Sequence, residues 1–223
     1  MVVTIDGPGG AGKSTVARAL AAELGFAYLD TGALYRAVAL GASWAGWEDE
    51  DDPAVVEAQL TRLEVEARPQ GGRFLVLLDG AEVERFIRNE HIGGVASRLS
   101  ALAPVRAFLL EVQRRAAAAG DLVAEGRDMG TVVFPQAEVK FFLTADDTER
   151  ARRRWRELRR KDPGLTLEAV AAELAARDRR DSSRKISPLR PAPDAVILDS
   201  TGLTVEDVVA RMKEVVHQFL SRA

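Results

Sequence analysis

The chain has 223 residues, of which 47% are hydrophobic, so it is long enough to bury a sizeable core. Its formal net charge of -3 excludes a global positive field that would hold nucleic acid or an anionic membrane. It has no cysteine and only two histidines, which excludes disulfides, thiolate nucleophiles and cysteine-ligated metals and leaves little material for a catalytic triad or a multi-histidine site.

The first elements are a predicted strand, loop and helix. An apolar, β-branched run from Val2 to Asp6 leads into a glycine cluster, after which Val16, Leu20 and Leu24 recur at helical spacing. No basic segment followed by a long apolar stretch is present, and nowhere do about 18 apolar residues run together. We therefore expect a cytoplasmic protein.

The next elements form a region of mixed character. Thr31 is expected to cap a second helix, and the acidic stretch 48–52 is expected to be an exposed loop. Over 62–85 the sequence alternates between apolar and polar residues and has turn signals at 70–72 and 79–80. This pattern predicts a small antiparallel insert.

The second half alternates between helices and strands, which implies a parallel sheet. Helical patterns are followed by buried strands at 122–124 and 139–143, with a turn-rich segment at 128–135 between them. The elements expected after these are an arginine-rich helix at 146–161, a helix at 166–182, a strand at 195–198, and a last helix that starts with a capping box of Thr204 and Asp207.

The motif with the clearest chemistry is a Walker A phosphate loop, Gly7-Pro8-Gly9-Gly10-Ala11-Gly12-Lys13-Ser14, placed between the first strand and the first helix. Its glycines let successive N–H groups turn toward phosphate oxygens, and the helix N-terminus adds partial positive charge. Lys13 would reach the β- and γ-phosphates, and the Ser14 hydroxyl would ligate Mg²⁺. The predicted ATP-binding residues are Gly7, Pro8, Gly9, Gly10, Ala11, Gly12, Lys13, Ser14 and Thr15.

A phosphate loop does not decide which reaction follows. A GTPase would need an Asn-Lys-x-Asp motif, but Asn89 is the only asparagine and is followed by Glu90, so this class is set aside. An ATPase motor or switch remains an alternative, with Asp79 or Asp199 as its magnesium ligand, although each is more simply read as a turn residue after a strand. The arginine-rich helix also leaves a nucleic-acid patch as an alternative.

Three further segments resemble bacterial cytidylate kinase, in the nucleoside monophosphate kinase family. They are Asp30-Thr31-Gly32-Ala33-Leu34-Tyr35-Arg36, Glu125-Gly126-Arg127-Asp128-Met129-Gly130-Thr131-Val132-Val133-Phe134-Pro135, and Arg177-Asp178-Arg179-Arg180-Asp181-Ser182-Ser183-Arg184. The resemblance implies an α/β P-loop kinase in which helices flank a central parallel five-stranded sheet. It implies one domain over 1–223, with a monophosphate-binding region at about 31–105 that includes the insert, and a helical lid at about 146–165.

The resemblance assigns roles to arginines and to their partners. Arg36, Arg127 and Arg184 would hold phosphate, which suits paired guanidinium groups. Arg177 and Asp181 would hold the acceptor ribose. Arg177, Asp181 and Arg184 also fall within roughly 60° of one helical face by their spacing, as they would on an ordinary salt-bridged surface. The expected catalytic residues are Lys13, Arg127 and Arg184.

The family places Ser97, Arg106 and Asp128 around cytosine. A carboxylate near the N4 amino group and a guanidinium near N3 and O2 would match that base and disfavour uracil. The predicted substrate-binding residues are Thr31, Arg36, Ser97, Arg106, Arg127, Asp128, Arg177, Asp181 and Arg184. Thr31 stands where relatives often have serine, and it keeps the hydroxyl.

The resemblance implies ATP-dependent phosphorylation of CMP and dCMP to CDP and dCDP by direct in-line transfer, in pyrimidine nucleotide metabolism. Mg²⁺ with ATP is the expected cofactor, and a monomer that binds neither nucleic acid nor membrane is expected. The alternatives are a P-loop kinase for another small acceptor, such as a different nucleoside monophosphate or shikimate, and an ATP-binding regulatory module without catalysis.

Overall fold

The computed structural model describes residues 1–47, 52–160 and 162–221. The chain divides into two compact units: unit 1 comprises Met1–Leu24 and Val123–Ala223, and unit 2 comprises Gly25–Leu122. The acidic loop expected at 48–52 lies outside the described residues except for Asp52, which caps α3. Within the described part of the chain, no helix is both long and apolar enough to cross a membrane.

Unit 1 is built around strands that lie in the order β6-β1-β7-β8. They are β1 (Val2–Asp6), β6 (Leu122–Gly126), β7 (Val139–Thr144) and β8 (Val196–Asp199). β7 pairs in parallel with both β1 and β8. β1 and β6 are almost wholly buried, as expected for apolar strands inside a parallel sheet.

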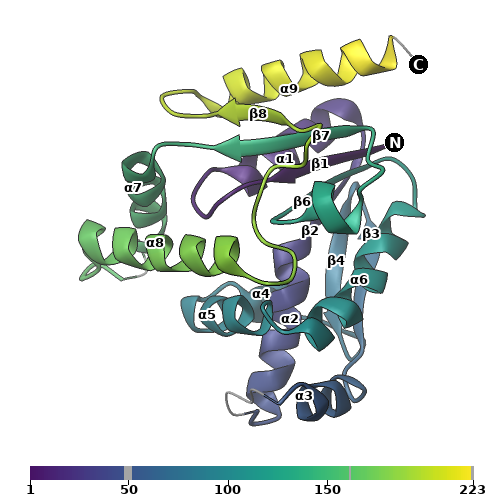
Figure 1. The fold of residues 1–223 in the computed structure, drawn as a ribbon, viewed down its shortest axis with the longest axis vertical. Helices are drawn as coiled ribbons and strands as arrows, with labels where there is room; N and C mark the ends of the chain where they lie inside the picture. The colour runs from purple at the N-terminus through teal and green to yellow at the C-terminus, as the bar shows by residue number, and fades with distance from the viewer. Residues whose placement is uncertain (48–51, 161, 222–223) are drawn as a thin grey trace. The chain divides into compact units, whose positions relative to one another are not determined.

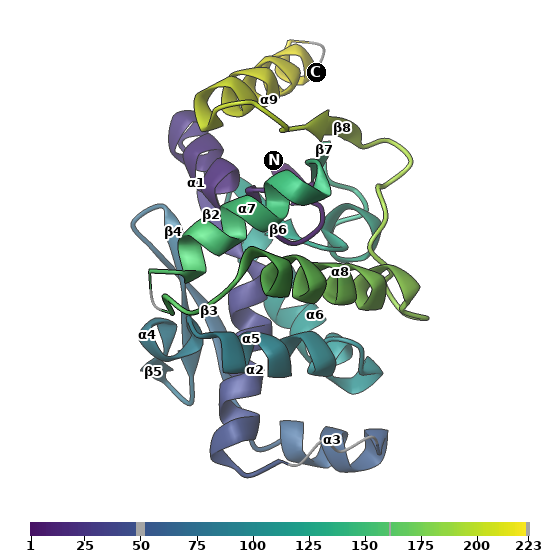
Figure 2. The same ribbon diagram turned by 90° about the vertical axis from the view of Figure 1, so that its left-hand side faces the viewer.

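The helices of unit 1 include the helix that makes up most of the predicted lid and the helix that follows it. They are α1 (Lys13–Leu24), a π-helical turn η1 (Met129–Val133), α7 (Asp147–Leu158), α8 (Leu167–Ser183) and α9 (Val205–Leu220). The capping box predicted at Thr204 and Asp207 is confirmed, because each residue bonds the other's backbone amide. α7 and α8 lie side by side (Figures 1 and 2), around buried Ala151, Leu158, Val170 and Leu174.

Unit 2 contains the predicted antiparallel insert. Its strands are β2 (Ala27–Asp30), β3 (Val65–Gln70), β4 (Arg73–Leu78) and β5 (Ala81–Glu82). β4 pairs antiparallel with β3 and β5, and parallel with β2. Gly71 and Gly72 connect β3 to β4 with φ of 56° and 77°, the left-handed backbone that a two-residue hairpin turn requires. The predicted insert and its first turn are therefore confirmed.

The helices of unit 2 are α2 (Thr31–Trp44), α3 (Pro53–Leu60), α4 (Glu84–Ile87), α5 (Glu90–Leu99) and α6 (Ala103–Ala117). The expectation that Thr31 caps α2 is wrong. The chain leaves β2 with an extended backbone at Asp30, and its carboxylate accepts a hydrogen bond from the Ala33 amide at 3.0 Å. Thr31 is instead the first helical residue and is buried.

The predicted fold class, an α/β P-loop kinase with mostly parallel strands and flanking helices, is confirmed. The proposed limits of the monophosphate-binding region and of the lid stay predictions. Between α7 and α8, the Trp155 indole donates to the Leu165 carbonyl at 2.8 Å, which ties the connecting segment back to α7.

Candidate active site

The phosphate loop follows the last residue of β1 and ends in the first turn of α1. A side chain at Gly7 would collide with the backbone carbonyl of Leu143, and one at Gly10, where φ is 73°, would come within 2.8 Å of the Arg150 carbonyl oxygen. Glycine is therefore required at both positions by space as well as by backbone angle. This close packing fixes the course of the loop.

Lys13 lies inside the loop that it terminates. Its side chain is buried, and its Nζ donates to the carbonyl oxygen of Pro8 at 2.8 Å. Burial and the neighbouring guanidinium of Arg127 lower the pKa of Lys13 to about 7, whereas Glu125 and Asp6 act in the opposite direction. Cationic groups are thus crowded around the loop, as suits a site that receives phosphate groups.

Three arginines surround the carboxylate of Asp181, which is 3% exposed. Arg127 Nε donates to Asp181 Oδ2 at 2.9 Å, and an Arg184 terminal nitrogen lies 3.8 Å from Oδ1. Burial alone would raise the pKa of Asp181, but the charges of Arg127, Arg177 and Arg184 hold it below its ordinary value. One carboxylate facing three guanidinium groups leaves an excess of positive charge.

Arg184 lies at the C-terminal end of α8. It is the C-cap residue directly after Ser183, and its φ of -56° is still helical, whereas its ψ of 136° turns the chain that follows out of the helix. Its Nε donates to the Asp181 carbonyl at 3.3 Å. Arg184 therefore lies beside Asp181, and the role given to it stays a prediction.

Arg127 and Asp128 immediately precede the π-helical turn η1. Asp128 is 2% exposed and takes the N-cap position of the turn, but its side chain makes no capping bond. The first two amides of the turn, those of Met129 and Gly130, instead donate to the Asp6 carboxylate at 2.8 Å each. Burial raises the pKa of Asp6 to about 6, against the effect of these two bonds.

Two residues of the predicted lid helix, Arg150 and Arg153, donate hydrogen bonds to the backbone of the phosphate loop. Arg150 donates to the Gly9 carbonyl oxygen at 2.8 Å and forms an ion pair with Asp178 of α8. Asp178 in turn accepts a hydrogen bond from the Gly9 amide at 3.2 Å. Arg153 bridges the Ala11 carbonyl and Ser200. These arginines contact protein backbone, a role that the sequence analysis did not foresee.

In unit 2, Ser100 at the end of α5 contacts both Ser97 and Arg106. Arg106 is 8% exposed, donates to the Ser100 carbonyl at 3.0 Å and lies over the ring of Tyr35. Ser97 is also buried, and no hydrogen-bond partner for its Oγ is found among the described residues. Arg36 projects from α2 toward Gly93 of α5.

The family model for cytidylate kinase matches residues 3–218. This chain belongs to the cytidylate kinase family. It is 48% identical over 223 residues to a cytidylate kinase of Geobacter sp. (strain M21), covering 100% of this chain and 95% of the relative. It is 49% identical over 208 residues to that of Vibrio cholerae serotype O1, covering 93% of this chain and 92% of the relative.

Among solved structures, an uncharacterized protein from Eubacterium ventriosum ATCC 27560 matches with a TM-score of 0.55 at 9% identity, over 98% of each chain. That likeness concerns the fold alone.

The predicted site residues of this cytidylate kinase family member are divided between the two units. Unit 1 carries the phosphate loop, Arg127, Asp128, Arg177, Asp181 and Arg184. Unit 2 carries Thr31, Arg36, Ser97 and Arg106. The sequence analysis missed Asp6, Arg150 and Asp178. For Asp6, a signal was available, because a carboxylate that ends a buried strand needs a partner.

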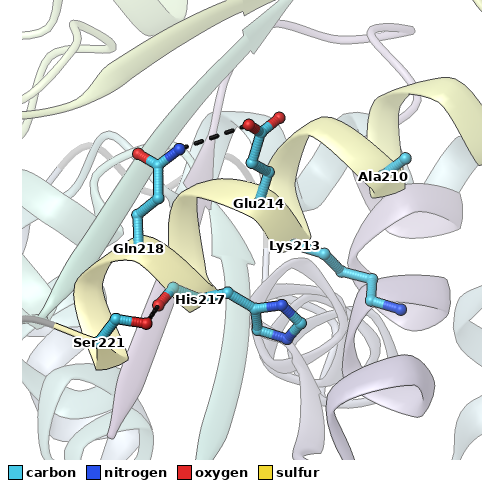
Figure 3. Close-up of a pocket in the computed structure, with 6 residues that line it drawn as sticks. All are labelled: Ala210, Lys213, Glu214, His217, Gln218 and Ser221. Carbon is cyan, nitrogen blue, oxygen red and sulfur yellow. Dashed lines mark hydrogen bonds between the residues drawn. The ribbon is translucent and has the colours of Figure 1, made fainter.

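A surface hollow lies elsewhere on unit 1, along one face of α9 (Figure 3). It is lined by Ala210, Lys213, Glu214, His217, Gln218 and Ser221. Several of its polar groups are already engaged, since Lys213 pairs with Glu23 at 2.6 Å and Ser221 donates to the His217 carbonyl at 2.8 Å. It contains none of the predicted site residues.

Proposed function

We propose that this chain transfers the γ-phosphoryl group of MgATP to CMP and dCMP, giving ADP with CDP or dCDP. Membership of the cytidylate kinase family supports the reaction and its acceptor. The observation that carries the proposal is the guanidinium cluster around Asp181, which borders the buried Lys13 of the phosphate loop. This arrangement supplies positive charge for two phosphate groups that must meet.

Residues Gly7 to Thr15 would bind the donor. The amides of the loop and of the first turn of α1 would cradle its phosphates, and Lys13 would exchange its bond to Pro8 for phosphate oxygens. Ser14 is exposed in that first turn, and one hydroxyl beside phosphate oxygens suits Mg²⁺, which prefers oxygen ligands and keeps several waters. Ser14 would help to hold Mg²⁺, which would supply positive charge against the negative charge that develops on the phosphate groups.

The acceptor residues proposed here are those that the family resemblance implies. Arg36, Arg127 and Arg184 would bind its phosphate. Arg177 and the ionised Asp181 would bind the ribose, where the carboxylate accepts from a hydroxyl. The hydroxyl of Thr31 is assigned to the same substrate.

The base would be read by three buried side chains. The Asp128 carboxylate would accept from the N4 amino group of cytosine, and Arg106 would donate to N3 and O2. Ser97 Oγ supports this assignment, because a buried hydroxyl without a protein partner is satisfied when a ligand bonds to it. Uracil presents a carbonyl at position 4, so Asp128 would disfavour UMP.

The reaction needs no strong base, because the acceptor phosphate is already anionic. Catalysis would come from holding the two phosphates in line and from the positive charge of Lys13, Arg127 and Arg184. Arg150 and Arg153 would act indirectly by fixing the loop at Gly9 and Ala11. Closure of the segment at about 146–165, which would exclude water, stays a prediction.

The test measures ADP formation from MgATP with CMP, dCMP, UMP, AMP, GMP and shikimate offered separately, beside a control without acceptor. We expect turnover with CMP and dCMP well above that with UMP. Activity only with another acceptor would overturn the base assignment, and nucleotide binding without turnover would favour the regulatory alternative. A cytoplasmic monomer that binds neither nucleic acid nor membrane also belongs to this proposal.

A further inference from the structure

Asp6 is a buried carboxylate to which the proposed reaction gives no role. It is 3% exposed and occupies the last position of β1, directly before Gly7, the first residue of the phosphate loop. Its side chain reaches a segment more than 120 positions later in the chain. Burying a carboxylate costs free energy unless its oxygens accept hydrogen bonds, so the bonds that Asp6 makes indicate its role.

Both oxygens of Asp6 are used by one short turn. Oδ1 accepts from the Met129 amide and Oδ2 from the Gly130 amide, each at 2.8 Å. These are the first two N–H groups of η1, which have no acceptor within a helical turn. Asp128 holds the N-cap position, but its side chain makes no capping bond. Asp6, at the end of β1, therefore caps the turn in place of Asp128, the residue at its N-cap position.

The same turn is supported at other points. A side chain at Gly130 would come within 3.1 Å of Thr4 Oγ1 and 3.2 Å of the Lys140 side chain, so the turn rests directly on β1 and β7. Lys140 Nζ also donates to the Pro135 carbonyl at 2.7 Å, just beyond the turn. Because these contacts remain when Asp6 is altered, a change at Asp6 should shift the start of the turn without unfolding it.

We propose that Asp6 is a positioning residue for recognition of the acceptor: by capping η1 it fixes the backbone that carries Asp128 and Arg127, and leaves base reading to the Asp128 carboxylate. The inference rests on the proposed function, because it concerns those two residues as acceptor contacts. Asp6 also connects the start of the donor loop with the start of the acceptor-reading turn through one side chain. If Asp6 were misplaced, recognition of the acceptor would be affected more than binding of the donor.

The test compares the wild-type protein with Asp6→Asn in steady-state kinetics. Asparagine keeps one acceptor oxygen but turns an NH₂ group toward the second amide, so one charge-assisted bond is replaced by a donor facing a donor. We expect kcat/KM for CMP to fall about tenfold or more and the ratio of kcat/KM for CMP over UMP to fall as well. The Kd for MgATP is measured as well, because Asp6 also interacts with the charge of Lys13, and it should change less than kcat/KM for CMP.

Thr4→Val provides the matched control. Thr4 is two residues earlier on the same face of β1, faces the same turn, and its Oγ1 has no hydrogen-bond partner within the described chain. Valine removes that hydroxyl and leaves both Asp6 bonds intact. CMP kinetics and CMP over UMP discrimination should stay within about twofold of wild type.

A second measurement keeps the test independent of activity and of the variant's folding. In the nucleotide-free wild-type protein, the Met129 and Gly130 amides should exchange with solvent as slowly as amides of β1, and in Asp6→Asn they should exchange faster. Fast exchange in the wild type would overturn the inference. So would a variant that loses thermal stability or ATP affinity but keeps its discrimination between CMP and UMP. A wild-type protein inactive with CMP would instead contradict the proposed function itself.

Discussion

At the scale of single residues, the site is governed by carboxylates that are buried beside cations. Asp181 illustrates the balance, because burial opposes its charge whereas Arg127, Arg177 and Arg184 favour it, and the pKa ends below the ordinary value of 3.8. A carboxyl whose pKa is lowered by folding stabilises the folded state above that ordinary value. The stabilisation is lost as pH falls through the lower, folded-state pKa.

Asp181→Asn should therefore show a pH-dependent loss of stability. Near pH 7 we expect the free energy of unfolding to fall by about 1–3 kcal/mol, because three guanidinium groups lose a charged partner. The difference from wild type should begin to shrink as the pH drops below about 4, where the carboxyl of the unfolded chain becomes protonated, and should shrink further as the pH falls through the lower pKa of the folded state. Urea unfolding of both proteins across this range measures the difference.

Glu157→Gln serves as the control for this series. Glu157 forms an exposed ion pair with Arg154, so its replacement should change stability by no more than about 0.5 kcal/mol at any pH. A constant difference between wild type and Asp181→Asn over the whole pH range would show that Asp181 acts through packing or neutral hydrogen bonds, and not through its charge.

At the scale of elements, α7 and α8 are both attached to one residue of the phosphate loop, Gly9. Arg150 holds the carbonyl of Gly9, Asp178 holds the amide of Gly9, and the two side chains pair with each other. The helix of the predicted lid, α7, and the helix that follows it, α8, are thereby both tied to the donor loop. Any movement of these helices would be transmitted to the loop through this contact.

A double-mutant cycle of Arg150→Gln and Asp178→Asn should reveal this coupling. Arg150→Gln leaves the Asp178 carboxylate without its cation, and Asp178→Asn leaves the buried Arg150 with only the exposed Asp147 as its partner. The double change removes both charges of the pair, so the effects should be non-additive by about 1–3 kcal/mol in the free energy of unfolding. Urea unfolding at neutral pH gives the four values. The exposed pair Arg154→Gln and Glu157→Gln should give a coupling below about 0.5 kcal/mol. A similarly small value for Arg150 and Asp178 would contradict the proposed coupling between these two residues.

The elements themselves were largely predictable from the sequence, whereas their tertiary contacts were not. Hydrophobic periodicity and the Walker A spacing predicted β1, the loop and α1, and paired turn residues such as Gly71 predicted the hairpins. By contrast, Asp178 bonds to Arg150, 28 positions away, and to Gly9, 169 positions away, and no local sequence pattern encodes such contacts. Thr31 was a misleading signal, because Asp30 competes for the same capping role with a more suitable backbone.

At the scale of the whole molecule, the predicted donor residues lie in one unit, and the predicted acceptor residues are divided between both units. The identities of the site residues were predicted from the family resemblance. Their supports, such as the Ser100 carbonyl that holds Arg106, depend on packing between helices and were not predicted. Because unit 2 carries predicted acceptor residues only, a change in unit 2 can separate effects on the acceptor from effects on the donor.

Ser97→Ala should separate acceptor binding from folding. Ser97 Oγ is buried, and no hydrogen-bond partner for it is found in the described part of the chain, so its removal should leave the ligand-free stability unchanged or raise it by up to about 1 kcal/mol. Ligands that bind only the folded state raise the melting temperature according to their affinity. We expect the upward shift in Tm with CMP to shrink and the shift with MgATP to persist.

Ser100→Ala is the matched change at the end of the same helix. Its Oγ donates to the Ser97 carbonyl at 2.9 Å, so its loss should lower the ligand-free stability by about 1 kcal/mol while the shift with CMP persists. Ser97→Ala should thus reduce the response to CMP without destabilising the protein, whereas Ser100→Ala should destabilise the protein and keep the response to CMP. If Ser97→Ala destabilised the ligand-free protein and kept its full response to CMP, Ser97 would be a structural residue, and the reading of cytosine would rest on Arg106 and Asp128 alone.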